Sequence, residues 1–344
     1  MSSPGPRSGI EHAVEQIAGA TSFSGAVRVD FTDGAVFERA YGFTHRGLRT
    51  PNTMHTRFGT ASATKGLTAL TVMSLVEDGV LGLDTTARSL LGDDLPLIAP
   101  DVTVEHLLGH RSGIGDYLDE STLGDITDHV LPVPVHVLAT TEAYLPMLAG
   151  RATAFPADSA FAYCNGGYVV VALLAERAAG VPFHDLVHTR VCTPAGMTAT
   201  GFPRSDEPDA LMAAGYLHAE GLRTNVFHLP VRGSGDGGAY TTTADVHALW
   251  TAVFAGRIVR PETVAAMVHP RSTTESGDDR YGLGFWLHRT SDAVSLEGYD
   301  AGVSFRSVHH PGSRLTHTVI ANTSEGAWPI TKRLSELLDE LPAG

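Results

Sequence analysis

Cysteine, long apolar runs and clustered basic residues are scarce or missing in this sequence of 344 residues. The only two cysteines, Cys164 and Cys192, are too few for a disulfide framework or a Cys-rich zinc site. No apolar run reaches the length of about eighteen residues that a membrane span requires. Residues 1–9 are small and polar, without the apolar stretch of a signal peptide. We therefore expect a reduced, cytoplasmic protein.

The charge balance is acidic, with 24 Lys and Arg residues against 38 Asp and Glu residues and a net charge of −14. This balance argues against nucleic acid and anionic membranes as partners. The 17 histidines show none of the usual metal-ligand spacings, such as H-E-x-x-H, so we predict no metal and no cofactor. A small-molecule substrate is expected, and the oligomeric state stays open.

Hydrophobic periodicity divides the chain into two ends that alternate helix with strand and a helical middle. The start has helical spacing over 10–18, then strand-like runs at 24–31 and 35–41 around an Asp-Gly turn signal. The end has predicted strands at 281–288, 293–298, 302–309 and 315–322, then a predicted helix over 328–341. The middle has predicted helices over 64–77, 102–108 and 165–179.

These patterns predict an α+β fold of two lobes. Residues 8–60 and 235–344 would form one lobe, an antiparallel sheet built from both chain ends and flanked by helices. Residues 61–234 would form a mostly helical insertion lobe. The active site is expected in the cleft between the two lobes.

Ser62 and Lys65 form the first chemical signal. The stretch Phe58–Gly66 (FGTASATKG) runs from small residues into a helix, with Ser62 in its first turn. Residues three apart share a helix face, so the hydroxyl and the amine can meet. The helix N-terminus favours negative charge, and the apolar helix that follows disfavours a charged amine. The pair predicts an activated serine nucleophile, although Ser as a cap and Lys as a solvated helix residue would give the same letters.

Further segments follow Ser62-x-x-Lys65 in order along nearly the whole chain: Val102–Gly113 (VTVEHLLGHRSG), Phe161–Asn165 (FAYCN), Pro194–Met197 (PAGM) and Gly235–Asp245 (GDGGAYTTTAD). This series resembles the serine β-lactamase and penicillin-binding-protein superfamily, in its class C-like branch of esterases and D-aminopeptidases. The resemblance implies that Ser62 is the acylated nucleophile, that Lys65 helps to deprotonate it and that Tyr163 is the general base. Asn165 would orient Lys65 or the acyl amide. From the residues alone, Tyr163 is equally a candidate core aromatic and Asn165 a candidate helix N-cap.

The chain departs from the family at the third motif, which reads Lys-Thr-Gly or His-x-Gly on a strand. Counting back from Gly302–Ser304 places Leu296, Glu297 and Gly298 there. The glycine is kept, which would let substrate lie close to the strand. Strand alternation turns Leu296 and Gly298 into the cleft, whereas a slip of one residue would turn Glu297 inward. Either way the cation that attracts a substrate carboxylate is missing, which argues against β-lactamase and carboxypeptidase activity.

The resemblance also implies an oxyanion hole made by the backbone N–H groups of Ser62 and Tyr299. Further residues are expected to contact substrate: Leu296, Glu297, Gly298, Asp116 and Tyr117. The segment 216–232 is a candidate lid. The expected function is a carboxylic ester hydrolase that acts on a small neutral acyl substrate through an acyl-enzyme.

An amidase or D-amino-acid peptidase, or an acyltransferase, would use the same acylation chemistry. A non-catalytic sensor or scaffold of this fold is the alternative from another class. Intact Ser62, Lys65 and Tyr163 argue against that alternative.

Overall fold

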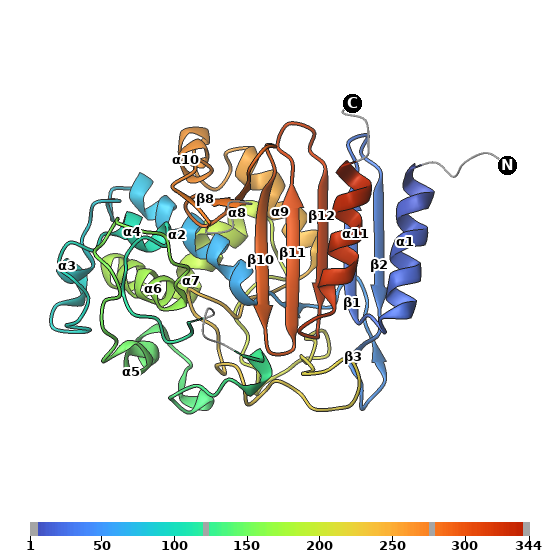
Figure 1. Cartoon of the computed structure of the whole chain (residues 1–344), viewed down its shortest axis with the longest axis horizontal. Coiled ribbons are helices and arrows are strands. Elements are labelled where there is room, and N and C mark those ends of the chain that lie inside the picture. The colour runs from blue at the N-terminus through green and yellow to red at the C-terminus, as the bar shows by residue number, and fades with distance from the viewer. Residues whose placement is uncertain (1–5, 120–123, 275–278, 340–344) are drawn as a thin grey trace.

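An eight-stranded antiparallel sheet forms the centre of the computed structural model, which describes residues 6–119, 124–274 and 279–339. The strand order is β2-β1-β12-β11-β10-β9-β8-β7 (Figure 1). Strands β1 (Gly25–Asp30) and β2 (Val36–Tyr41) form a hairpin, and β1 pairs with β12 (Thr316–Ala321). Both ends of the chain thus build one sheet, and the predicted α+β fold class is confirmed.

The other strands of this sheet are β7 (Ser272–Thr273), β8 (Asp279–Tyr281), β9 (Trp286–His288), β10 (Val294–Asp300) and β11 (Val303–His309). The prediction of one strand over 281–288 is wrong, because a turn separates β8 from β9. Gly284 has a φ of +91° in this turn, and a Cβ there would lie 2.2 Å from the Cβ of Ala69. Glycine suits this point of the turn, because the backbone is left-handed there and α2 leaves no room for a side chain.

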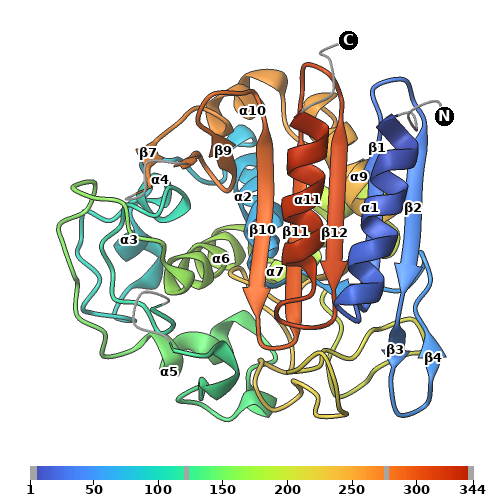
Figure 2. The same ribbon diagram turned by 45° about the vertical axis from the view of Figure 1, so that its right-hand side comes forward.

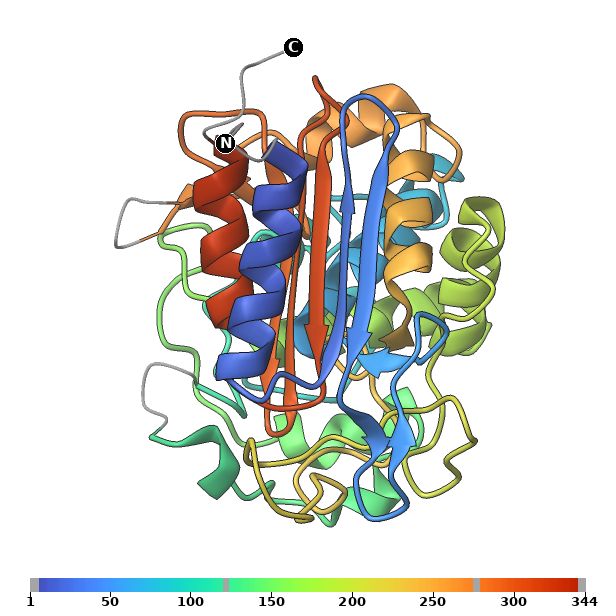
Figure 3. The same cartoon turned by 90° about the vertical axis from the view of Figure 1, so that its right-hand side faces the viewer.

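Helices α1 (Pro6–Ala20) and α11 (Ala327–Asp339) lie side by side over one face of the sheet (Figure 3). Ile10 and Val14 of α1 and Ile330 and Leu334 of α11 are buried against this face. Their spacing of four residues places each pair on one side of its helix. The predicted end of the last helix at residue 341 lies outside the described residues.

The opposite face of the sheet packs on α2 (Thr64–Glu77) and α9 (Thr243–Phe254). The helices α3 to α6 lie beyond β10, as Figures 1 and 2 both show. The remaining helices are α3 (Ala87–Leu91), α4 (Val104–Leu108), α5 (Leu145–Leu148), α6 (Asn165–Ala179), α7 (Phe183–Val187), α8 (Thr193–Ala195) and α10 (Pro261–Met267). The predicted lobe boundaries, after residues 60 and 234, stay predictions.

Short elements complete the described chain. The small strands are β3 (Phe43–His45), β4 (Thr50–Pro51), β5 (Phe58–Gly59) and β6 (Tyr240–Thr241). The 3₁₀ turns are η1 (Ala61–Ala63), η2 (Ile126–Asp128), η3 (Val135–Val137) and η4 (Thr141–Tyr144), and η5 (His188–Cys192) is a π-helical turn. Strand β5 lies just before η1 in the chain and pairs with β6. This pairing helps to fix where α2 begins.

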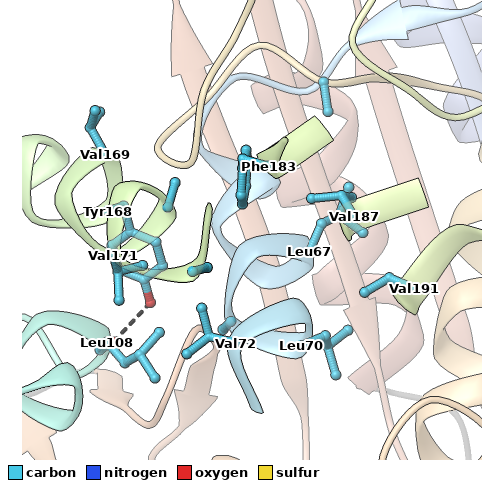
Figure 4. Close-up of a cluster of buried hydrophobic side chains, with 14 of the residues drawn as sticks. Leu67, Leu70, Val72, Leu108, Tyr168, Val169, Val171, Phe183, Val187 and Val191 are labelled. Atoms are coloured by element: carbon cyan, nitrogen blue, oxygen red, sulfur yellow. Dashed lines mark hydrogen bonds between the residues drawn. The ribbon is translucent and has the colours of Figure 1, made fainter. Parts of the chain in front are cut away.

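Helices α2 and α6 are buried on nearly all sides and form the centre of the larger core. Figure 4 shows Leu67, Leu70 and Val72 of α2 facing side chains of α6 and α7. The Tyr168 hydroxyl donates to the Leu108 carbonyl at 2.8 Å, so this buried polar group is satisfied. Within the described ranges, no single helix is both long and apolar enough to cross a membrane, although α6 and the segment 183–195 would pass together as a pair bent by 85°.

Candidate active site

Ser62 lies in the short turn η1, directly before α2. Ala61 has a φ of +44°, which is a strained conformation for a residue with a Cβ. Two buried threonines hold this turn: Thr64 Oγ1 donates to the Ala61 carbonyl at 2.8 Å, and Thr60 Oγ1 donates to the Ala239 carbonyl at 3.0 Å. The strained turn leaves the Ser62 side chain partly exposed at the N-terminus of a buried helix.

Lys65 is 2% exposed, and its amine lies among three oxygen acceptors. Lys65 Nζ donates to Ser62 Oγ at 2.9 Å, to Asn165 Oδ1 at 2.7 Å and to the Asp236 carbonyl at 2.8 Å. The predicted meeting of Ser62 with Lys65 is therefore present. An ammonium has three N–H donors and no acceptor, so these partners suit the charged form.

Asn165 is the first residue of α6, and the alternative that it serves as the N-cap is wrong. The N-cap is Cys164, whose Sγ accepts from the Gly167 N–H. Asn165 Nδ2 donates to the Leu118 carbonyl at 3.1 Å, which turns the amide oxygen toward Lys65. The orientation of Lys65 by Asn165 thus has a geometric basis.

Asp116 binds the N-terminus of α6. Its two carboxylate oxygens accept from the N–H groups of Asn165 at 2.7 Å and Gly166 at 2.8 Å. Burial raises the pKa of Asp116, and these backbone hydrogen bonds act in the opposite direction. These contacts give Asp116 a positioning role at the start of α6, and its expected substrate contact stays a prediction.

Tyr163 stands between two other aromatic rings, a partner set that the sequence did not reveal. Trp286 stacks on it with ring centroids 5.8 Å apart and planes inclined by 12°, and the His110 ring lies 4.3 Å away. Lys65 Nζ lies 4.8 Å from the centroid of the Tyr163 ring. Burial and the charge of Lys65 lower the pKa of His110, whose Nδ1 accepts from the Cys164 N–H at 3.0 Å. A neutral imidazole therefore supports the tyrosine.

The alternation of β10 is as predicted, but neither Leu296 nor Glu297 faces an open cleft. Leu296 is 4% exposed and packs on Gly66, where an added Cβ would lie 2.5 Å from a Leu296 methyl group. Glu297 points to the other face of the sheet and pairs with Arg306 at 2.8 Å. The expected substrate contacts of both residues are corrected, because one side chain fills the core and the other is ion-paired behind the strand.

Gly298 brings β10 close to the nucleophile segment. A Cβ at this position would lie 2.0 Å from the Thr60 carbonyl oxygen and 3.1 Å from the Ala63 nitrogen. The reason for a glycine here is therefore the approach of the protein's own backbone and not, as expected, the approach of substrate. The following residue, Tyr299, is 40% exposed and carries the second N–H of the predicted oxyanion hole.

Tyr117 and Asp236 form a buried hydrogen-bonded pair beside Lys65. The Tyr117 hydroxyl donates to the Asp236 carboxylate, and the Asp236 carbonyl accepts from Lys65. Burial raises the pKa of both side chains, and that of Tyr117 is well above its ordinary value. Sequence reasoning missed Asp236, and the available signal was its place as the single acid within the glycine-rich residues 233–238.

A cavity that is partly open to solvent lies beside these residues. Ala61, Tyr117, Asp236 and Asp300 are among its lining residues. The candidate lid over 216–232 contributes five residues to the same wall: Asn225, Val226, Leu229, Pro230 and Val231. Closure of this segment over a substrate stays a prediction.

A family model described as Beta-lactamase matches residues 10–328. The chain is 27% identical over 341 residues to a D-aminopeptidase of Brucella anthropi, covering 96% of this chain and 62% of that protein. It is 34% identical over 192 residues to the esterase EstB of Burkholderia gladioli, covering 54% of this chain and 48% of that protein. The crystal structure of a penicillin-binding protein from Bacillus halodurans superposes with a TM-score of 0.88 and 34% identity, covering 94% and 99% of the two chains.

Proposed function

Because the chain belongs to the beta-lactamase family, we propose that this serine hydrolase cleaves carboxylic esters of small molecules through an acyl-enzyme on Ser62. The observation that carries the proposal is the hydrogen bond from Lys65 Nζ to Ser62 Oγ, at 2.9 Å, in a buried site. A buried lysine with a serine hydroxyl among its partners is the arrangement that activates a serine nucleophile.

The proposed reaction begins when Ser62 Oγ attacks the ester carbonyl carbon. The serine proton passes to the Tyr163 phenolate, which is stabilised by the charge of Lys65, whose Nζ lies 4.8 Å from the ring centroid. The N–H groups of Ser62 and Tyr299 donate to the carbonyl oxygen as it becomes an oxyanion. Tyr163 then returns the proton to the departing alcohol, and a water molecule hydrolyses the acyl-enzyme by the same steps.

The charges around Ser62 favour esters over substrates that carry a carboxylate. Leu296 stands where the resemblance to the family implies a basic side chain, and it is buried. Asp116 and Asp236 both lie close enough to Lys65 for its charge to act on their carboxyl groups. A substrate carboxylate would therefore meet negative charge without a second cation.

A fluorophosphonate probe followed by intact mass measurement tests the nucleophile. We expect one label on the wild-type protein, one label on the control Ser89→Ala, and none on Ser62→Ala. Ser89 is an exposed serine of α3, and its hydroxyl donates to the Thr86 carbonyl. Hydrolysis of p-nitrophenyl acetate and butyrate should greatly exceed that of nitrocefin. Equal labelling of Ser62→Ala and wild type, or rapid turnover of nitrocefin, would contradict the proposal.

A further inference from the structure

We propose that Asp236 is a specificity-determining residue that selects acyl chains ending in an ammonium group, which enter the cavity beside Ser62. The inference rests on the proposed acyl-enzyme function and names the acyl group that this function serves. The observations that carry it are the place of the cavity, the apolar side chains of its wall and the charge that it contains.

The cavity is lined by a chain neighbour of each predicted oxyanion donor. Ala61, which directly precedes Ser62, and Asp300, which directly follows Tyr299, both line it. An acyl group bound to Ser62, with its carbonyl oxygen between these two N–H groups, would therefore have the cavity within reach of its chain.

The wall of the cavity suits an alkyl chain. Apolar side chains that line it include Pro203, Val226, Leu229, Pro230, Val231 and Val303. Methylene groups of a substrate would pack on these side chains and leave water, which is favourable for each buried methylene. A wholly apolar acyl chain would need only these apolar side chains. The acidic residues of the cavity, Asp236 and Asp300, therefore indicate a polar group on the substrate.

Negative charge is the second property of the cavity. Asp236 and Asp300 line it, whereas no Lys, Arg or His is found among its described lining residues. Asp236 is 7% exposed. Its carboxylate accepts from the Tyr117 hydroxyl, which stays protonated because burial raises the pKa of Tyr117 well above the ordinary value. A buried carboxylate is stabilised by a cation that reaches it, and an alkylammonium entering along the apolar wall would supply that cation.

Lys65 does not already fill this role by direct hydrogen bonding to the carboxylate. Its amine binds Ser62, Asn165 and the main-chain carbonyl of Asp236. Burial raises the pKa of the Asp236 side chain, and the charge of Lys65 acts in the opposite direction. Asp236 thus binds Lys65 through its backbone carbonyl and Tyr117 through its carboxylate, and both Asp236 and Tyr117 line the cavity.

Matched esters test the inference. We would measure kcat/KM for p-nitrophenyl ε-aminocaproate and for p-nitrophenyl heptanoate, in which a methyl group replaces the ammonium. Wild type should prefer the ammonium ester by about 10- to 100-fold, the range expected for a hydrogen bond between charged groups. In Asp236→Asn, which keeps an acceptor for Tyr117, this ratio should fall close to one. The ratio cancels any effect of the substitution on the shared acylation step.

The control Asp93→Asn removes one negative charge from an exposed position outside the cavity and should keep the wild-type ratio. A purely structural Asp236 would slow both esters equally and leave the ratio unchanged, which would overturn the inference. So would a wild-type ratio near one while heptanoate is hydrolysed through Ser62, a result that leaves the proposed function standing.

A binding measurement decides the inference if no ester is hydrolysed at all, a result that would refute the proposed function. Titration calorimetry should show n-hexylammonium binding to wild type at least about 10-fold more tightly than n-hexanol. Asp236→Asn should lose that difference. Equal binding of the two ligands to wild type would refute the inference independently of catalysis.

Discussion

Replacement of Gly298 by alanine should disable the reaction centre without touching a side chain that takes part in the chemistry. The added Cβ would lie 2.0 Å from the Thr60 carbonyl oxygen, whereas real Cβ atoms stay at least 3.0 Å from such an atom. Strand β10 and the η1 turn must therefore separate by about 1 Å. This movement pulls the N–H of Tyr299 away from Ser62.

The magnitude follows from the geometry of an oxyanion hole. Loss of one donor, or a displacement of about 1 Å at a reaction centre, costs on the order of 10²-fold in rate. We therefore expect kcat for p-nitrophenyl acetate to fall by about 10²-fold in Gly298→Ala. Fluorophosphonate labelling of Ser62 should slow in parallel, because the phosphonyl oxygen uses the same donors.

Gly47→Ala is the matched control, because a Cβ at Gly47 meets nothing within 4 Å. Its rate should match that of wild type. Urea unfolding of both variants separates a loss of folded protein from a loss of activity in the folded protein. Activity of folded Gly298→Ala within about threefold of wild type would refute the claim that the close approach of β10 to η1 positions the oxyanion donor.

Two further predictions concern stability. Asp116→Ala should lower the free energy of unfolding by about 1–2 kcal/mol in urea titrations, because it leaves the Asn165 and Gly166 N–H groups at the start of α6 unpaired; Asp116→Asn should recover part of this loss, and an unchanged Asp116→Ala would contradict the capping role. Burial lowers the pKa of His317 to about 3, below its unfolded value of about 6.5, so the unfolded chain binds the extra proton between these pH values. Its contribution is complete above about pH 6.5 and decreases as the pH falls toward 3, by roughly 1.4 kcal/mol per pH unit. His317→Leu should therefore weaken the fall in unfolding free energy between about pH 7 and pH 5, whereas exposed His12→Leu should not; identical slopes in wild type and His317→Leu would refute this assignment.

Local sequence patterns were sufficient for the helices that carry the reaction centre. Helices α2 and α6 occupy 64–77 and 165–179, the ranges predicted from apolar periodicity. The contact of Ser62 with Lys65 follows from their spacing of three residues, because that spacing determines a shared helix face. The prediction of one strand over 281–288 was wrong. The turn that divides this segment contains Gly284, which lies close to Ala69 of α2, and a contact between distant segments is not visible in a local pattern.

The partners of the reaction centre were decided by the tertiary structure. Lys65 and Asp236 are 171 residues apart in sequence, and Tyr117 and Asp236 are 119 apart, so no local pattern could reveal their contacts. Strand alternation alone placed Leu296 and Glu297 on opposite faces, but only the packing of Leu296 on Gly66 shows that its face is filled. The sequence by itself determined the contact of Ser62 with Lys65 and the helices that carry the two candidate residues, because periodicity and short spacing are local properties. The acid beside the cavity and the carboxylate that caps α6 depended on which distant backbone and side-chain groups the fold brings together.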